Sequence, residues 1–168
     1  MRSYYLPTFC FLLLIPFISS AQIKVLPTIS LGYMNHLNRS GYNAEVGINF
    51  ELNKRLDIAP SFRFSNLDSG NPNNKVSVRA GALFLSYIFI NNGKYRLLAG
   101  PGLSFGTYER STEGIGFEKE YNDTWFNPLK ARFDYNINEQ LRLGFDASIY
   151  GDDSDGSIFL GLVMSYLL

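Results

Sequence analysis

The sequence predicts an all-β fold, an antiparallel up-and-down barrel of about eight strands. Three observations predict it. Apolar and polar residues alternate with a period of two, which places them on opposite faces of a strand. Clusters of turn-forming residues separate the alternating stretches. Finally, these breaks alternate strictly between short and long along the chain.

The first 21 residues have the layout of a secretory signal peptide, so we exclude them from the fold. Arg2 gives a basic start, an apolar run covers residues 9–18, and the small residues 19–21 follow. The apolar run is far shorter than the ~20 residues of a spanning helix. Cleavage would remove Cys10, the only cysteine, so the predicted mature domain, residues 22–168, can form no disulfide.

Composition limits the possible functions. The 168 residues carry a formal net charge of zero, which argues against a nucleic-acid partner. Charged residues make up 18% of the chain, below the ~25% usual for soluble domains, and aromatic residues make up 15%. The sequence has no glycine-rich phosphate loop and no cysteine or histidine metal cluster. We therefore expect no cofactor.

The breaks are of two kinds. Asn91-Asn92-Gly93 is a strong hairpin signal, because asparagine and glycine tolerate the positive φ of such turns. Further short breaks fall at residues 53–55 and 136–140, and long polar breaks fall at residues 35–41, 66–75, 109–123 and 151–156. Transmembrane barrels have tight periplasmic turns and long external loops. The alternation thus predicts a transmembrane barrel with both termini on the periplasmic side.

The second predicted strand shows the period of two most clearly. One face carries Tyr42, Ala44, Val46, Ile48, Phe50 and Leu52, and the other carries Asn43, Glu45, Gly47, Asn49 and Glu51. Residues 129–137 and 141–149 repeat the pattern. In a membrane barrel the apolar face contacts lipid and the polar face lines the lumen.

This register predicts a lumen that contains charges of both signs. The expected lumen residues are Glu45, Glu51, Asp57, Arg63, Arg79, Arg96, Lys130, Arg132, Asp134, Arg142 and Asp146. About eight strands leave an interior only wide enough for side chains to fill. Isolated charges there would be too costly. We therefore expect a salt-bridged plug and not a pore.

Several positions fit the pattern less well. Pro27, Pro60 and Pro101 cannot donate to a β-ladder, so we expect local bulges at each. In the fourth stretch, residues 76–90, the register places Arg79 inward, together with Leu83, Leu85, Tyr87 and Phe89, while Ser86 faces lipid. A bulge could switch this phase.

We favour another explanation for the fourth stretch, a small internal apolar core toward the periplasmic end. The same register also turns Leu26, Leu98, Val163 and Leu167 inward at that end. Aromatic residues near strand ends favour interfacial girdles. They are Tyr33, Tyr42, Phe64, Tyr95, Tyr108, Trp125, Tyr135, Tyr150 and Tyr166.

Residues 95–106, Tyr-Arg-Leu-Leu-Ala-Gly-Pro-Gly-Leu-Ser-Phe-Gly, resemble the strands of small outer-membrane β-barrel domain proteins, porin-family-like barrels common in Bacteroidota. The last strand is similar to a barrel-assembly signal, with Gly161, Met164 and Tyr166 at the characteristic spacing. It departs from the signal by ending in two leucines. The resemblance implies location in the outer membrane, contact with its lipid, and recognition of the last strand by the barrel-assembly machinery. The family includes porin-like and adhesive members.

An enzyme is one alternative. His36, the only histidine, lies in the first long break, and Asp68 and Ser69 lie in the second. They resemble the loop-borne histidine and Asp-Ser of lipid A palmitoyltransferases. No His-x-Ser pattern of the kind found in lipid A deacylases is present. Because Asp and Ser are common in loops, we expect no catalytic role for these residues.

Two further loops invite a binding interpretation. Residues 151–156 offer clustered carboxylates, but Gly151 and Leu162 occupy positions where a calcium loop needs acids, so we expect a solvated hairpin and no metal. Residues 109–123 mix charges with Ile115 and Phe117, which could mark a partner site. A solvated loop is the default interpretation.

The second alternative is a secreted soluble barrel of the lipocalin type that carries an apolar ligand. Such a carrier would turn its apolar face inward, with Val46, Ile48, Phe62, Phe133 and Phe145 lining the cavity. The loop alternation, the missing disulfides and the final strand favour the membrane. We expect a non-enzymatic outer-membrane protein, structural or surface-interacting through its external loops.

Overall fold

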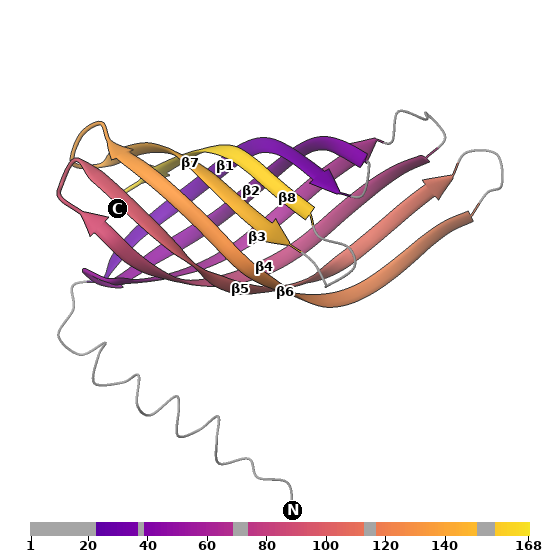
Figure 1. Cartoon of the computed structure of the whole chain (residues 1–168), viewed down its shortest axis with the longest axis horizontal. Helices are drawn as coiled ribbons and strands as arrows, with labels where there is room; N and C mark the ends of the chain where they lie inside the picture. The colour runs from indigo at the N-terminus through magenta and orange to yellow at the C-terminus, as the bar shows by residue number, and fades with distance from the viewer. Residues whose placement is uncertain (1–22, 37–38, 69–73, 113–116, 151–156) are drawn as a thin grey trace, which may run out of the picture.

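The described residues of the computed structural model, 23–36, 39–68, 74–112, 117–150 and 157–168, form a closed barrel of eight antiparallel strands (Figure 1). The strands are β1 (Lys24–His36), β2 (Arg39–Asn53), β3 (Leu56–Asp68), β4 (Asn74–Asn91), β5 (Tyr95–Thr112), β6 (Phe117–Asn136), β7 (Leu141–Tyr150) and β8 (Ser157–Tyr166). Each strand pairs with its sequence neighbours. None of the described residues belongs to a helix long and apolar enough to cross a membrane. The predicted fold class is confirmed.

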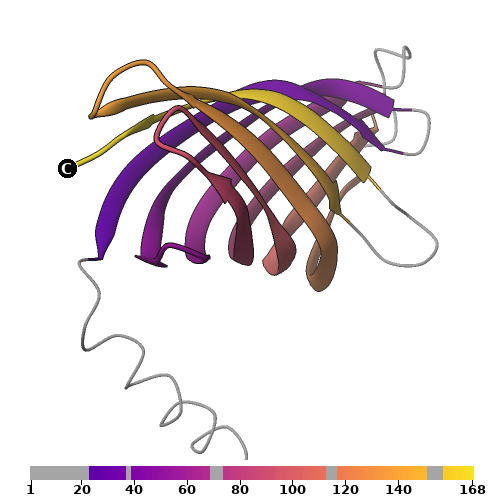
Figure 2. The ribbon, with the colours of Figure 1, turned by 60° about the vertical axis from the view of Figure 1, so that its left-hand side comes forward.

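Pairing between the first and last strands closes the barrel. β1 and β8 are in register from Thr28, opposite Ser165, to His36, opposite Ser157. Closure satisfies the backbone groups that an open sheet would leave unpaired along its edges. The described part of the barrel begins with β1 and ends with β8 at the same end, next to the three short turns (Figure 2). We call this the turn end and the opposite one the loop end.

An asparagine organises each short turn. The side-chain oxygen of Asn92 accepts hydrogen bonds from the backbone N–H groups of Lys94 at 3.2 Å and Tyr95 at 2.8 Å, and Gly93 has a positive φ of 81°. Asn53 and Asn138 accept equivalent bonds in the other two turns. These local bonds fix the turn conformation, and the short breaks predicted from sequence are confirmed.

At the loop end the strands continue further than the polar composition indicates. His36 pairs with Arg39, Asp68 with Lys75, and Thr112 with Phe117, so most of the breaks predicted at 35–41, 66–75 and 109–123 belong to β-hairpins. Polar side chains end the apolar stripe without ending the backbone ladder, which is why composition misplaced these boundaries. The break at 151–156 lies outside the described residues.

Only one of the three prolines lies at a predicted bulge. The β5–β6 register shifts between Gly100 and Gly102, around Pro101. Pro27 instead pairs in register with Ile48, and Pro60 with Leu83. The bulges predicted at Pro27 and Pro60 are therefore wrong.

The expected inner face of β4 is also wrong. Leu83, Leu85, Tyr87 and Phe89 are exposed on the outside, and Arg79 is exposed there with them. The inner face carries Val76, Val78, Ala80, Ala82, Phe84, Ser86 and Ile88. Because both faces of this strand are mostly apolar, alternation of polarity could not assign its phase.

Apolar side chains also fill the lumen near the loop end. The cluster consists of Met34, Ala59, Leu67, Val76, Val78, Ala80, Ala82, Phe84, Tyr150 and Phe159. Toward the turn end, Leu26, Leu98 and Val163 are buried as predicted, whereas Leu167 is half-buried. The larger internal apolar cluster thus lies at the end opposite to the one expected.

Candidate functional site

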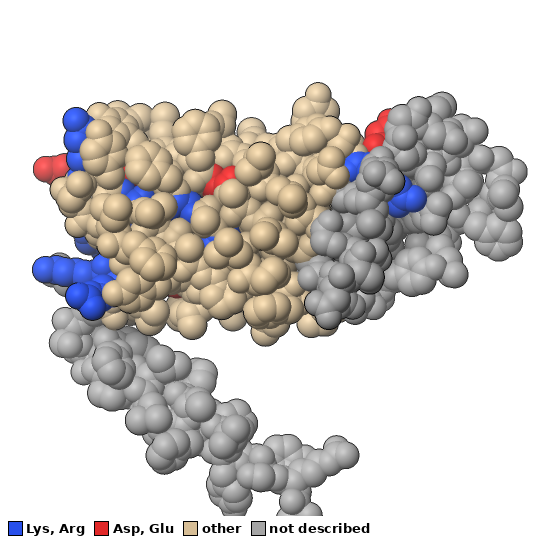
Figure 3. Space-filling model, in the orientation of Figure 1, with Lys and Arg blue, Asp and Glu red and all other residues tan. Residues whose placement is uncertain are grey.

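The outer face of the barrel is an apolar belt. Phe105, Leu162 and Phe145 are each more than 60% exposed on it, and uncharged residues cover most of the barrel side in Figure 3. On β5 the belt extends from Tyr95 to Phe105. Ten residue steps at about 3.3 Å each, tilted by about 40°, span about 25 Å, the height of the apolar band of outer-membrane barrels.

The orientation of this belt contradicts the lipocalin alternative. Val46, Ile48, Phe62, Phe133 and Phe145 would line the cavity of such a carrier, yet all five are exposed on the outside. The inner face is polar over much of its height. It therefore has no continuous apolar wall for a ligand.

Charged side chains fill the lumen beneath the belt. The buried residues are Glu45, Glu51, Asp57, Arg63, Arg96, Lys130, Arg132, Asp134, Arg142 and Asp146, five acids and five bases. Arg79 was expected among them, but its guanidinium carbon lies on the outer face, 5.8 Å from the ring centroid of Phe64. With Arg79 outside, the formal charge of the buried set is zero.

Six of the buried charges form a turn-side cluster centred on Arg96. Its guanidinium lies 2.6 Å from the Asp57 carboxylate, 3.0 Å from that of Asp134 and 3.3 Å from that of Glu51. Arg132 contacts Asp134 at 2.7 Å, and Arg142 contacts Glu51. Three acids thus meet three arginines, which offsets the cost of burying each charge.

The other four form a loop-side cluster around Glu45. Arg63 contacts Glu45 at 3.2 Å, and Lys130 bridges Glu45 and Asp146, the second at 3.7 Å. The Arg63 guanidinium carbon lies 3.2 Å from the ring centroid of Tyr150, whose hydroxyl donates to Glu45 at 3.3 Å. Two acids and two bases again balance, and an aromatic ring covers one of the cations.

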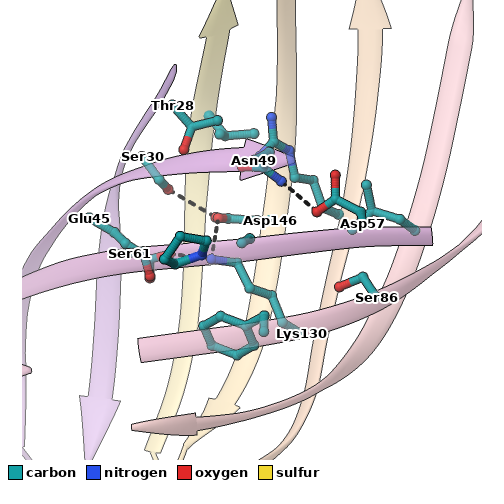
Figure 4. Close-up of a pocket in the computed structure, with 15 residues that line it drawn as sticks. Thr28, Ser30, Glu45, Asn49, Asp57, Ser61, Ser86, Lys130 and Asp146 are labelled. Atoms are coloured by element: carbon teal, nitrogen blue, oxygen red, sulfur yellow. Dashed lines mark hydrogen bonds and ion pairs between the residues drawn. The ribbon is translucent and has the colours of Figure 1, made fainter. Parts of the chain in front are cut away.

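A small cavity lined by both polar and apolar side chains lies between the clusters (Figure 4). Its volume is about 20 Å³, enough for about one water molecule. Asn49 lies at its edge, where it donates to Asp57 at 2.8 Å and accepts from Arg132 at 3.4 Å. Ser30 donates to Asp146 at 3.0 Å on the other side. The cavity is far too small for a small-molecule ligand.

Tyr150 was missed as a lumen residue. Its position at a strand end predicted an interfacial girdle, but it is buried inside the barrel with Asp146 and Ser148. These three residues lie two apart along β7, so the period of two was the signal that would have placed Tyr150 inside. Its hydroxyl also accepts a bond of 2.6 Å from Ser148.

The residues of the enzyme alternative lie at the loop end. His36 ends β1 and Asp68 ends β3, with β2 between these strands. Ser69 and the possible calcium loop 151–156 lie outside the described residues. Within the part of the chain that the structure describes, no three His, Cys, Asp or Glu side chains are grouped to hold a metal ion.

No family model and no curated protein sequence matches the chain. Solved structures do. Neisserial surface protein A is 12% identical, with a TM-score of 0.67 over 87% of this chain and 97% of its own. Ail, the attachment invasion locus protein of Yersinia pestis, is 14% identical, with a TM-score of 0.60 over 86% and 99%.

The N-terminal β-barrel domain of Pseudomonas aeruginosa OprF is 18% identical, with a TM-score of 0.61 over 88% of this chain and all of that one. These similarities establish that the chain has the fold of small eight-stranded outer-membrane barrels. At sequence identities this low, the similarities show a shared fold and do not show a shared function.

Proposed function

We propose that this protein is a non-enzymatic barrel of the bacterial outer membrane, exported by a signal peptide at residues 1–21. The proposal rests on the opposite polarity of the outer and inner faces of the barrel wall. Apolar side chains form a belt of about 25 Å on the outside, and ten buried charges lie inside. In water this arrangement would expose a large apolar surface, whereas in a bilayer both faces are satisfied.

The lumen of this barrel is closed. Ion pairs join β2, β3, β5, β6 and β7 across the interior, and the cavity between the clusters is about the size of one water molecule. Above them the side chains of Phe84, Phe159 and Tyr150 fill the loop side. Solute transport through the barrel would require this packing to be rearranged.

The barrel holds structural or recognition segments at the cell surface. Its external segments, residues 35–41, 66–75, 109–123 and 151–156, are where an extracellular partner would bind. The Ail structure contains a heparin analogue, sucrose octasulfate, and the Neisserial protein is named as a surface protein. These similar structures support a surface role for such a scaffold, and they identify no partner for this chain.

The last strand supports delivery through the barrel-assembly machinery. On β8, Met164 and Tyr166 face outward, half exposed, at the spacing of the assembly signal. We also place the protein among the porin-family-like barrels of Bacteroidota on the resemblance of residues 95–106. No catalytic role is assigned to His36, Asp68 or Ser69.

Fractionation tests the proposal. The full chain, expressed in a Gram-negative host, should appear in the outer-membrane fraction, resist carbonate extraction, and migrate differently on a gel before and after boiling. Heat-dependent migration reports a folded barrel, and carbonate resistance reports insertion. A soluble periplasmic band without a heat shift would overturn the proposal.

A further inference from the structure

Basic side chains gather at the turn end, at the start of β1 and in the β2–β3 and β4–β5 turns, where the outer-membrane proposal places the periplasmic leaflet. This basic rim consists of Lys24, Lys54, Arg55 and Lys94, all exposed. Glu139 is the exposed acid at this end among the described residues. Four cations and one acid give a net side-chain charge of +3 at an end of a chain whose total formal charge is zero. Blue atoms accordingly gather at the left-hand end in Figure 3.

Lys94 connects the rim to the apolar belt. Its ammonium nitrogen lies 5.8 Å from the ring centroids of both Tyr95 and Tyr135. These two tyrosines form the edge of the belt nearest the turn end. The two rings are themselves 5.6 Å apart. A lysine whose stem follows aromatic surface and whose charge lies at its edge has the arrangement of side chains at a membrane interface.

Hydrogen bonds fix the backbone of the two turns that carry Lys54, Arg55 and Lys94. Asn92 accepts the Lys94 N–H, and Asn136 donates from its side chain to the Gly93 carbonyl at 2.5 Å. In the β2–β3 turn, the Arg55 carbonyl accepts the N–H of Ile88 at 2.8 Å. Both turns are thus tied to a neighbouring strand. Binding an anion at the rim would cost little backbone ordering.

We propose that the basic rim binds anionic phospholipid headgroups of the leaflet at the turn end. The inference rests on the proposed membrane location. Charge complementarity selects the phosphate and the net negative headgroup, while continuity with the apolar belt brings the rim to headgroup level. A free phosphate ion would meet the same side chains in water, where screening weakens each contact. The acyl chains packed on the belt supply the added affinity of the lipid.

Lipid selectivity of the inserted barrel tests this proposal. The refolded chain is placed in phosphatidylcholine nanodiscs with trace spin-labelled phosphatidylglycerol or phosphatidylcholine, and the motionally restricted fraction of each label is measured. We expect phosphatidylglycerol to be enriched about two- to five-fold at low ionic strength. In Lys54→Gln/Arg55→Gln/Lys94→Gln the ratio should fall to about one. Lys54→Arg/Lys94→Arg, which keeps the charge, should retain the enrichment.

The outcomes separate this inference from the membrane proposal. A wild-type barrel that inserts and shows the heat shift, but has no preference for phosphatidylglycerol, overturns the rim alone. A chain that does not insert overturns the membrane location as well. Inorganic phosphate should reduce the enrichment no more than sodium chloride at equal ionic strength. A larger reduction by phosphate would show that the rim binds free phosphate. If the barrel showed no lipid selectivity but was pulled down by peptidoglycan, the rim would instead be a binding site for the cell wall.

Discussion

Arg96 on β5 and Asp57 on β3 meet across the lumen, with 2.6 Å between the guanidinium Nη2 and the carboxylate Oδ2, although β4 separates their strands in the barrel wall. Asp57 is 0% exposed and Arg96 is 1% exposed. The contact therefore connects strands that do not hydrogen-bond to one another. Loss of either partner would leave the other charge buried without its counter-charge.

Replacing the central arginine should strongly destabilise the barrel. Arg96→Met leaves Glu51, Asp57 and Asp134 with two arginines, so one buried carboxylate loses its counter-charge. Breaking a buried pair in this way costs about 3–5 kcal/mol. Urea unfolding in lipid vesicles measures the loss. Lys94→Met, which removes an exposed cation, is the control, and a similar small effect from both variants would contradict the role of Arg96.

The loop-side cluster should show coupled energetics. Glu45→Gln leaves Arg63 and Lys130 with one acid, Asp146, between them. Adding Lys130→Met restores neutrality, so the double variant should be more stable than the sum of the two single losses predicts. We expect a coupling free energy of about 1–3 kcal/mol. Additive losses in equilibrium unfolding would show that the cluster is not an energetic unit.

A charge in the belt should be tolerated only outside a membrane. Phe145 is 65% exposed on the outer face of β7, so Phe145→Lys buries no group in the folded chain itself. In a bilayer the lysine should cost about 2–4 kcal/mol near the midplane. Unfolding in vesicles measures this cost, with Gln140→Lys in the exposed β6–β7 turn as the control. Equal stability of the two variants would argue against lipid contact at Phe145.

The packed lumen should not conduct ions. Purified wild-type protein in planar bilayers should give no steady single-channel current, because charged pairs and the apolar cluster block the interior. The triple variant Arg63→Ala/Phe84→Ala/Tyr150→Ala removes three of the largest side chains of the loop-side half and should raise the frequency of openings. Steady conductance of the wild type would show that the lumen is not plugged.

The sequence pattern predicted the wall of the barrel better than its interior. On β2, β6 and β7 one face is apolar and the other polar, so alternation alone assigned Glu45, Asp134 and Asp146 to the inside. On β4 the lumen side is itself apolar, and the rule failed for Arg79. Which charges pair was also beyond the pattern, because contacts such as that of Arg96 with Asp57 depend on curvature across several strands.

The loop end shows a second limit of sequence reasoning. Polar composition marked residues 109–123 as a loop, but the ladder between β5 and β6 continues to Thr112 and Phe117. Hydrogen bonds of the backbone do not depend on whether side chains meet lipid or water. Composition therefore located the boundary of the apolar layer, not the end of the strands.

Spin-label accessibility along β7 tests the central claim most directly. Removal of residues 1–21 leaves a domain without cysteine, so single cysteines at 142, 143, 145, 146, 148 and 149 can each be labelled without background. In vesicles, labels at 143, 145 and 149 should collide readily with oxygen dissolved in lipid, and labels at 142, 146 and 148 should be protected from oxygen and from a water-soluble nickel complex. Loss of the period of two, or access of the nickel complex to 143, 145 and 149, would contradict a lipid-facing belt around a packed, charged lumen.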